Sequence, residues 1–333
     1  MIDNSREISE YIDLNDKFLI VTHYNPDGDA IGSSLGLMSL LRDSGKSADF
    51  YMPHVVPDKY AKFAGGLVLT GNMPDLSAYS TIICVDFSSP ERANLPQNVK
   101  IDSLGKFLIN IDHHPDNRLF GGLNLVDPSA SAAAEVIYEL AKFADFKFSP
   151  KAARFLLMGI LADTGGFRFD NSSPRALRTA AKLIDAGVDF GTLAKDLFFS
   201  KPLSVAKLEA EIINNRMKTA FDGRFAWAIL DEELFYKYGL RPEESEGLID
   251  VIRCIEGTVA VAFIYQNFDG FRCSLRSREK SFSVGKIARR IGGGGHELAA
   301  GAFIKTNMAD IAEKTLLDNI EKALKEYDEK ASF

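Results

Sequence analysis

The sequence has few cysteines, and their arrangement argues against a disulfide-stabilised or zinc-finger protein. Its three cysteines, Cys84, Cys254 and Cys273, are odd in number and lie far apart, so they match neither a disulfide framework nor the spacing of a zinc site. Scattered cysteines of this kind are usually buried thiols. We therefore expect a protein of a reducing, cytoplasmic compartment.

Long apolar runs and an excess of positive charge are also absent. No run reaches the roughly 18 apolar residues of a membrane span, and the polar residues 1–7 lack the apolar core of a secretory signal. We therefore expect no membrane partner. The formal net charge of −7 argues against a protein that coats long duplex nucleic acid, although a local basic patch can still bind a small anion.

The 333 residues are enough for two domains. In the first half, short apolar runs predict buried parallel strands at 17–22, 48–52, 81–85 and 107–111, with helices between and after them. In the second half, strands are expected at 225–230, 258–265, 271–276 and 301–305, with a hairpin turn at 267–270 and a closing amphipathic helix at 311–327.

These elements predict an α/β fold with a mostly parallel N-terminal sheet flanked by helices, and a smaller C-terminal α/β domain across a cleft. We place the first domain at residues 1–188, a helical connector at 189–220 and the second domain at 221–333.

Four of the five histidines lie in short patches rich in aspartate or glycine, which together predict a two-metal phosphoesterase site. The patches are 22–29, 85–89, 112–114 and 293–296, and a fifth patch at 162–166 adds Asp163. Imidazole and carboxylate ligands together suit Mn²⁺, Zn²⁺ and similar divalent ions. Two such ions about 3.5–4 Å apart can clamp the attacking and leaving oxygens of a phosphoryl displacement.

The first patch places His23, Asp27 and Asp29 at a strand-to-helix turn. Alternate residues of an extended turn project in similar directions, so Asp27 and Asp29 can face two neighbouring ions. Alternatively, Asp29 caps the helix and His23 is simply buried. A helix cap needs only one acid, however, not two acids and a histidine.

Asp86 and the triplet Asp112-His113-His114 each follow a buried strand, at the sheet edge where open α/β folds bind ligands. Asp86 alone is compatible with an ordinary turn, but its two carboxylate oxygens would let it bridge two ions. Adjacent histidines point in different directions, so one can bind metal while the other meets the substrate.

Asp163 precedes Gly165 and Gly166, which permit close approach of the backbone to a ligand. A plain turn at the end of a helix is the alternative for this patch.

The second half carries a local excess of positive charge. Residues 272–290 contain seven basic residues and one acid, a net +6 over 19 positions, and the glycine run ending at His296 follows. Glycine turns form anion-binding nests, and arginine pairs with phosphate. A solvated helix face would explain Arg289 and Arg290, but it explains Arg276, His296 and the glycines poorly.

With these motifs, the chain resembles the DHH-family phosphoesterases, which are named for the triplet Asp112-His113-His114. Gly293-Gly294-Gly295-His296 resembles the signature of the DHH-associated C-terminal domain. In length and motif pattern the chain is most similar to the subfamily of bifunctional oligoribonucleases and pAp phosphatases, the nanoRNases.

The resemblance implies roles for individual residues. One ion, Mn²⁺ above all, would be held by His23, Asp27 and Asp86. The second would be held by Asp29, Asp86, His113 and Asp163, with Asp86 bridging the two. The catalytic residues implied are Asp86, Asp112 and His114, with His114 near the scissile phosphate. Substrate would be bound by Arg276, Gly293, Gly294, Gly295 and His296.

The resemblance also implies a function. It is hydrolysis of short single-stranded RNA or DNA, of 3′-phosphoadenosine 5′-phosphate (pAp), or of both, releasing mononucleotides or phosphate. Linear dinucleotides such as pApA are the alternative substrate. The sequence does not rank these substrates, and it leaves cleavage direction and oligomeric state open, a homodimer included.

Three other functions fit the sequence less well. An inorganic pyrophosphatase would need no glycine-rich nucleotide platform. A RecJ-like exonuclease usually carries further nucleic-acid-binding parts. A nucleotide-sensing module with an inactive centre would not need the full set of expected ligands that is present.

Overall fold

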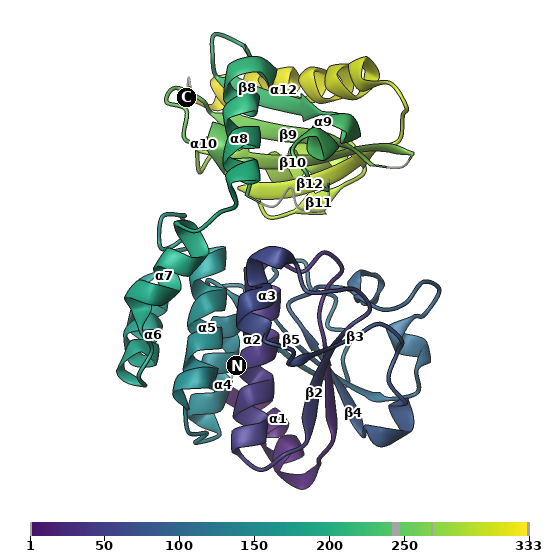
Figure 1. Cartoon of the computed structure of the whole chain (residues 1–333), viewed down its shortest axis with the longest axis vertical. Coiled ribbons are helices and arrows are strands. Elements are labelled where there is room, and N and C mark those ends of the chain that lie inside the picture. The colour runs from purple at the N-terminus through teal and green to yellow at the C-terminus, as the bar shows by residue number, and fades with distance from the viewer. Residues whose placement is uncertain (1, 242–246, 268, 332–333) are drawn as a thin grey trace. The chain divides into compact units, whose positions relative to one another are not determined.

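The computed structural model describes residues 2–241, 247–267 and 269–331 of the chain. The chain divides into two compact units, Met1–Ser200 and Lys201–Phe333, each with its own six-stranded sheet (Figure 1). The division falls within the segment expected as a connector, whose residues 189–200 belong to the first unit and 201–220 to the second.

The first unit is built on a parallel sheet with the strand order β3-β2-β1-β4-β5-β6. Its strands are β1 (Phe18–Val21), β2 (Ala48–Met52), β3 (Val68–Thr70), β4 (Thr81–Val85), β5 (Phe107–Asp112) and β6 (Leu123–Val126). Its helices are α1 (Ile2–Leu14), α2 (Gly28–Asp43), α3 (Asp58–Ala64), α4 (Ala133–Phe143), α5 (Pro150–Asp163), α6 (Pro174–Asp185) and α7 (Phe190–Phe198). Three short 3₁₀ helices complete it: η1 (Leu76–Ala78), η2 (Pro90–Arg92) and η3 (Ile101–Ser103).

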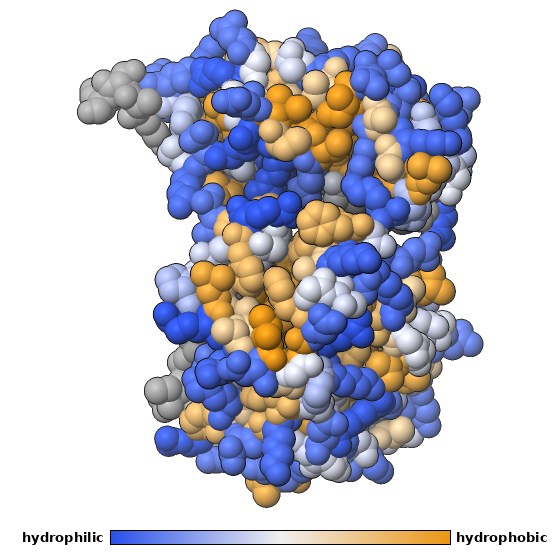
Figure 2. Space-filling model, turned by 60° about the vertical axis from the view of Figure 1, so that its left-hand side comes forward, coloured by the Kyte–Doolittle hydropathy of each residue, from blue (hydrophilic) through white to orange (hydrophobic). Residues whose placement is uncertain are grey.

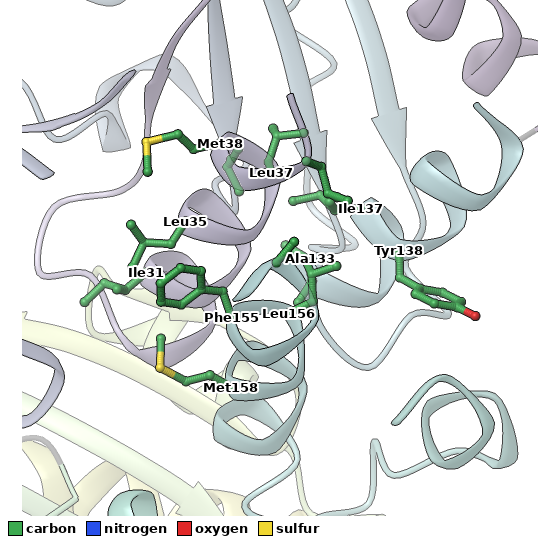
Figure 3. Packing of buried hydrophobic residues seen from close by; sticks show 14 of the residues in the cluster. Ile31, Leu35, Leu37, Met38, Ala133, Ile137, Tyr138, Phe155, Leu156 and Met158 are labelled. Atoms are coloured by element: carbon green, nitrogen blue, oxygen red, sulfur yellow. The ribbon is translucent and has the colours of Figure 1, made fainter. Parts of the chain in front are cut away.

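The two faces of this sheet are covered differently. Side chains from α1 to α5 pack on one face, around strand residues such as Ile20, Ile83 and Ile109. Figure 1 shows these helices beside the sheet, and Figure 3 shows side chains of α2, α4 and α5 in this core. The other face, with Leu19, Val21 and Ile82, is covered by 3₁₀ helices and loops. Because both faces are covered, β1 and β4 are buried at every position, which explains their uninterrupted apolar sequences.

Glycines bring α2 and α5 unusually close. Gly28, Gly32 and Gly36 follow one another at four-residue intervals and so lie along one side of α2. A Cβ at Gly32 would lie 2.7 Å from the backbone N of Gly159 and from the backbone O of Phe155, both in α5. Around this contact, Phe155 packs beside Ile31 and Leu35 (Figure 3). The close approach brings the start of α2 beside the end of α5.

The second unit has a mixed sheet with the order β11-β12-β10-β9-β8-β7, in which only the β8–β9 pair is parallel. Its strands are β7 (Met217–Ala220), β8 (Phe225–Leu230), β9 (Ala260–Asn267), β10 (Gly270–Ser277), β11 (Gly294–Gly295) and β12 (Ala299–Ile304). Its helices are α8 (Leu203–Glu211), the π-helical turn η4 (Ile212–Arg216), α9 (Glu232–Lys237), α10 (Asp250–Arg253), α11 (Val284–Arg290) and α12 (Ala309–Ala331). One face packs against α11 and α12, and the opposite face packs against α8, η4, α9 and α10.

The predicted mostly parallel N-terminal sheet flanked by helices and the smaller C-terminal α/β unit are confirmed, and every strand expected from the sequence is present within a few residues of its expected bounds. The sequence did not predict α1, α3, the edge strands β3 and β6, or β7. Phe268, in the expected hairpin turn, lies outside the described residues, but the flanking strands β9 and β10 pair antiparallel as expected.

The surface is largely hydrophilic on the side shown in Figure 2, where apolar side chains form smaller groups between polar ones. Among the described helices, none combines the length and the apolar character needed to cross a membrane.

We expect Gly32→Ala to destabilise the protein, because the added methyl would overlap the backbone of α5. Overpacking should outweigh the helix propensity that alanine gains, leaving a net loss of about 1–2 kcal/mol. In a domain of this size the loss corresponds to a Tm lower by about 2–8 °C, measurable by thermal unfolding. The matched control is Gly191→Ala in α7, where the nearest atom to an added Cβ is a carboxylate oxygen 3.6 Å away. An unchanged Tm for Gly32→Ala would contradict the close packing described here.

Candidate metal centre

The acidic patches meet at the carboxyl edge of the parallel sheet, where the chain changes direction. Strand β1 pairs with β2 on one side and β4 on the other, so the connections run outward in opposite senses from β1 and β4. Such a switch point leaves a crevice at the strand ends, where open α/β sheets bind ligands. His23 follows β1 by two residues, Asp86 follows β4 directly, and Asp112 ends β5.

The turn after β1 places His23 and Asp27. His23 is buried, its Nδ1 lies 2.9 Å from the carbonyl oxygen of Tyr24, and its Nε2 lies 3.6 Å from Asp86 Oδ2. Burial opposes protonation of His23, but Asp86 and Asp27 outweigh it and raise its pKa. Asp27 is the N-cap of α2, and its Oδ1 accepts hydrogen bonds from the backbone N–H groups of Asp29 and Ala30. The expectation that Asp29 can cap this helix is therefore wrong, because Asp29 already lies inside the first turn.

Asp29 instead points toward the start of another helix. It is 1% exposed, and its two oxygens accept hydrogen bonds from the backbone N–H groups of Ala133 (2.6 Å) and Ala134 (3.1 Å) at the N-terminus of α4. A helix N-terminus favours a carboxylate, because its first N–H groups lack partners within the helix. The same carboxylate lies 4.0 Å from Nε2 of His113, so it faces the centre as well.

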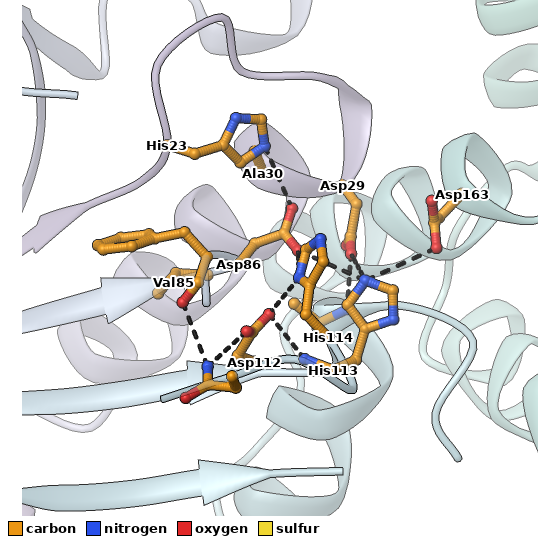
Figure 4. Close-up of polar contacts among 12 residues, drawn as sticks. His23, Asp29, Ala30, Val85, Asp86, Asp112, His113, His114 and Asp163 are labelled. Carbon is orange, nitrogen blue, oxygen red and sulfur yellow. Dashed lines mark hydrogen bonds and ion pairs between the residues drawn. The ribbon is translucent and has the colours of Figure 1, made fainter. Parts of the chain in front are cut away.

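Asp86 lies at the middle of the cluster, between His23 on one side and His113 and His114 on the other (Figure 4). Its Oδ2 faces His23, and its Oδ1 lies 3.5 Å from His113 Nε2 and 3.7 Å from His114 Nδ1. Burial alone would raise its pKa, but the imidazoles of His113 and His23 outweigh burial and hold the pKa well below its ordinary value. Asp86 also has φ +66°, a strained conformation that is uncommon for a residue with a side chain and concentrates at functional sites.

His113 joins the sheet to the end of α5. Its Nδ1 lies 3.4 Å from the carbonyl oxygen of Ala130, and its Nε2 lies 3.8 Å from Oδ2 of Asp163, the last residue of α5. A ligating imidazole is commonly held in this way, with one nitrogen donating to a backbone carbonyl and the other facing the ion. Asn171 donates hydrogen bonds to the backbone oxygen and to Oδ2 of Asp163 and so helps to fix it.

His114 is oriented by Asp112, which is fully buried. Asp112 Oδ1 lies 2.7 Å from His114 Nδ1 and accepts the backbone N–H of His113 at 2.8 Å. Its other oxygen, Oδ2, accepts a 2.6 Å hydrogen bond from the amide of Asn117. The same amide donates to Asn110 Oδ1 at 2.8 Å, so both of its hydrogens have close acceptors. Asp112 therefore positions His114 through its Nδ1 atom, and the Nε2 atom of His114 lies on the opposite side of the imidazole ring.

The separations between the donor atoms suit ligands that share a divalent ion better than they suit direct hydrogen bonds. Three triplets each bring ligand atoms within 4.8 Å: His23–Asp27–Asp86, Asp29–Asp86–His113 and Asp86–Asp112–His114. Nitrogen and oxygen ligands that share one ion at about 2.0–2.2 Å are themselves about 3–3.6 Å apart, and the separations of 3.5–3.6 Å between Asp86 and the Nε2 atoms of His23 and His113 match this spacing. In the described part of the chain, Asp86 Oδ1 is a buried oxygen that accepts no hydrogen bond, as expected of an atom reserved for a cation.

Negative charge also accumulates in the centre. Burial and the charge of Asp86 raise the pKa of Asp29 well above its ordinary value. Burial, with Asp27 and Asp86, raises the pKa of Asp163 to about 6, although this side chain keeps 31% of its exposure and solvent tempers the effect. Neighbouring carboxylates in low dielectric disfavour ionising together. Bound divalent cations would remove this conflict.

The second unit places the predicted phosphate-binding residues around β10, β11 and β12. Arg276 lies on β10, and Gly294 and Gly295 form β11, which pairs with β12. A Cβ at Gly293 would lie 2.1 Å from the backbone O of Gly301, and Gly295 has φ +130°, so both positions require glycine for close packing on β12. Gly294 differs, because an added Cβ there would meet no atom within 4 Å.

Arg289 and Arg290 contribute to the basic segment in a different way. Arg289 pairs with Glu297 and Arg290 with Glu326, both through exposed side chains. These two pairs agree with the alternative of a solvated helix face.

Two groups of residues at the centre were not predicted from the sequence. Asn117 and Asn110 fix Asp112 and could have been suspected only from their position beside the triplet. The glycines of α2 had a clearer signal, since Gly28, Gly32 and Gly36 recur every four residues beside Asp27 and Asp29.

The fold and this centre define a hydrolase of the metal-dependent phosphoesterase class. Residues 17–160 match the model of the DHH family, N-terminal domain, and residues 224–332 match the DHHA1 domain. The chain belongs to the DHH family, as the motifs predicted.

Two curated relatives cover nearly all of the chain. It is 34% identical to the bifunctional oligoribonuclease and PAP phosphatase NrnA of Thermus thermophilus, over 92% of this chain and 89% of that protein. It is 31% identical to the protein of the same description from Bacillus subtilis, over 97% and 99%. Among solved structures, an exopolyphosphatase-related protein from Bacteroides fragilis shares the fold, with a TM-score of 0.83, 24% identity, and coverage of 99% of this chain and 98% of that one. The predicted similarity to the oligoribonuclease and pAp phosphatase subfamily is thus confirmed.

We expect Asn117→Ala to lower kcat by roughly 10-fold with little change in KM, because Asp112 would lose a charge-assisted hydrogen bond worth about 1.5–3 kcal/mol and would hold His114 less firmly. Steady-state kinetics on a phosphodiester substrate with a divalent ion tests this. Asn15→Ala removes a comparable side-chain hydrogen bond, to the carbonyl of Tyr11 in α1, and serves as the control. If Asn117→Ala raised KM alone, or lowered kcat no more than Asn15→Ala does, Asn117 would not position His114.

Proposed function

We propose that the protein hydrolyses short single-stranded oligonucleotides and pAp, releasing mononucleotides or phosphate. The observation that carries this proposal is the cluster around Asp86, a buried carboxylate that faces three imidazoles and belongs to all three candidate ligand triplets of the first unit. The two relatives described as oligoribonuclease and PAP phosphatase support the choice of substrate, because they match the chain over most of its length.

We infer that two divalent ions bind in this centre, one held by His23, Asp27 and Asp86 and the other by Asp29, Asp86, His113 and Asp163. When bound, such ions stabilise charge on phosphoryl oxygens and lower the pKa of water, so that hydrolysis proceeds near neutral pH. Mn²⁺ is the ion that we propose, because carboxylates suit it and it also accepts imidazole ligands.

The residues outside the ligand set have separate tasks. Asp112 holds the Nδ1 side of His114, so we propose that His114 directs Nε2 toward the scissile phosphate and donates a hydrogen bond to an oxygen of the reacting group. Asn117 and Asn110 keep Asp112 in place. The first turn of α4 holds Asp29, which fixes one carboxylate of the centre before substrate binds.

We propose that the second unit binds the nucleotide through Arg276, His296 and the backbone of Gly293, Gly294 and Gly295. Open space above Gly294 and the guanidinium of Arg276 support this assignment, because backbone N–H groups and arginine both bind phosphate oxygens. Linear dinucleotides such as pApA carry the same groups and are the nearest alternative substrate.

We also propose that the enzyme acts in the reducing cytoplasm. Its cysteines Cys84, Cys254 and Cys273 are all free thiols. Burial raises the pKa of Cys273 to about 12, which keeps this thiol protonated and unreactive.

The proposal predicts that the wild-type protein hydrolyses a diribonucleotide and pAp when Mn²⁺ is supplied, and that Asp86→Ala loses more than about 100-fold in kcat together with bound metal. Removing Asp86 should affect both ions, since it is the carboxylate that the two ligand sets share. The measurements are product release by chromatography and metal content by elemental analysis.

Asp102→Ala is the control for that variant, because Asp102 is an exposed aspartate in η3. A folded Asp86→Ala protein that kept both ions and substantial activity would overturn the ligand assignment. A wild-type protein that hydrolysed neither substrate with any divalent ion would overturn the proposed function.

We expect Arg276→Ala to raise KM for a dinucleotide by roughly 10- to 150-fold while changing kcat little, because a lost charge-assisted contact costs about 1.5–3 kcal/mol. His296→Ala should act in the same direction with a smaller effect. Arg290→Ala is the matched control, since Arg290 belongs to the same basic segment but pairs with Glu326. Unchanged KM values for both Arg276→Ala and His296→Ala would show that this surface does not bind substrate.

A further inference from the structure

One face of the sheet in the second unit is covered by helices only over part of its width. On β9, the side chains of Val261, Phe263 and Tyr265 are buried beneath α8, η4, α9 and α10. The neighbouring strands β10 and β12 continue the same face, because residues opposite one another in antiparallel pairs point to the same side. That face of β10 and β12 carries Arg272, Ser274, Arg276, Ala299, Gly301 and Phe303.

The residues on this uncovered part suit a nucleic acid strand. Phe303 is 42% exposed, and Gly301 beside it is exposed as well. Arg272 lies directly opposite Phe303, and the six residues include two arginines and no acid, in a chain with a net charge of −7. Surfaces that bind single strands combine positive charge with aromatic rings on which bases stack.

Phe303 has a fixed support. A Cβ added at Gly270 would lie 2.5 Å from the Cζ atom of the Phe303 ring, so the ring rests against the backbone of Gly270 where no side chain intervenes. An aromatic ring that packs on one side and stays exposed on the other needs little reordering when a base stacks on it.

Along the strand direction, the ring of Phe303 lies well away from Arg276, the proposed phosphate contact. Arg272 and Arg276 are four residues apart on β10, which places them about 14 Å apart along the strand at ~3.4 Å per residue. At ~3.4 Å per stacked nucleotide, the interval holds up to about four nucleotides, and fewer in an extended strand. A mononucleotide bound at Arg276, or a dinucleotide with stacked bases, would therefore not reach Phe303.

We propose that Arg272 and Phe303 form a second nucleotide subsite, in which Phe303 stacks on a base and Arg272 binds a phosphate of the same strand. The subsite rests on the proposed function and adds to it a contact made only by substrates longer than a dinucleotide. It raises the efficiency of the enzyme on oligonucleotides of about four or five residues relative to pAp and dinucleotides.

The test compares Phe303→Ala and Arg272→Ala with the wild type on pAp and on single-stranded RNAs of two, three, five and seven nucleotides, with Mn²⁺ at fixed salt. For the pentamer, kcat/KM should fall about fivefold or more in each variant, as expected when one stacking contact is lost. For pAp and the dinucleotide, it should stay within about twofold. Phe303→Tyr should restore the pentamer value, because the ring is retained, whereas Phe303→Leu should not.

Phe199→Ala is the matched control, since Phe199 is an 82% exposed phenylalanine outside this surface. Thermal unfolding of each variant checks the fold. Equal losses of kcat/KM on the dinucleotide and the pentamer would overturn the subsite. An unchanged kcat/KM at every length would also overturn it, and is the result expected if this face binds a protein partner. Both results leave the proposed function intact, whereas a wild type inactive on every nucleotide would refute the function itself.

Discussion

The mutual repulsion of buried carboxylates is the constraint on which this protein depends. Asp29 and Asp86 are almost completely buried in one centre, and Asp27 and Asp163 lie beside them. In low dielectric such groups are costly to ionise together, and His23 and His113, whose pKa values are raised, compensate only part of the charge. A cluster of this kind persists only if the surrounding fold holds it rigidly and a cation completes it.

The rigidity comes from backbone contacts that leave little room for change. The glycines of α2 let its first turn lie against the end of α5, which fixes Asp29 beside Asp163. The sheet supplies the other side, because parallel strands place His23, Asp86 and Asp112 at one edge. The candidate ligands thus come from the ends of three strands and from two helices, all of them elements of the first unit.

The sequence predicted the parts of the fold with strong local signals. Strands β1, β4 and β5 were recognised because they are largely buried and each contains a short run of mostly apolar residues. Edge strands β3 and β6 are short and partly exposed, so their sequences resemble loops. The sequence left Asp29 as a possible N-cap of α2, whereas the cap is Asp27, because both aspartates are suitable caps and only backbone geometry distinguishes them.

The site was predictable as far as residue type carries chemistry. Histidines and aspartates at strand ends predicted residues that the structure brings together in one cluster, and the resemblance to a family implied their roles. The residues that hold this cluster in place were not predictable, because Asn117 acts on Asp112 through a side-chain hydrogen bond that sequence spacing does not reveal. Likewise, the exposed ring of Phe303 sits in a strand whose alternation indicates only which face it occupies.

The hydrogen bonds from α4 to Asp29 have a consequence for experiments on the centre. Because both oxygens of Asp29 accept hydrogen bonds from backbone N–H groups, a substitution that removes the carboxylate would take away a candidate ligand and also loosen the start of a helix. An asparagine at this position would place its NH₂ group against one of the two backbone N–H donors, which cannot accept a hydrogen bond from it. Loss of activity at Asp29 therefore mixes two causes, whereas loss of the Asp86 carboxylate, which faces imidazoles, reports more directly on the centre.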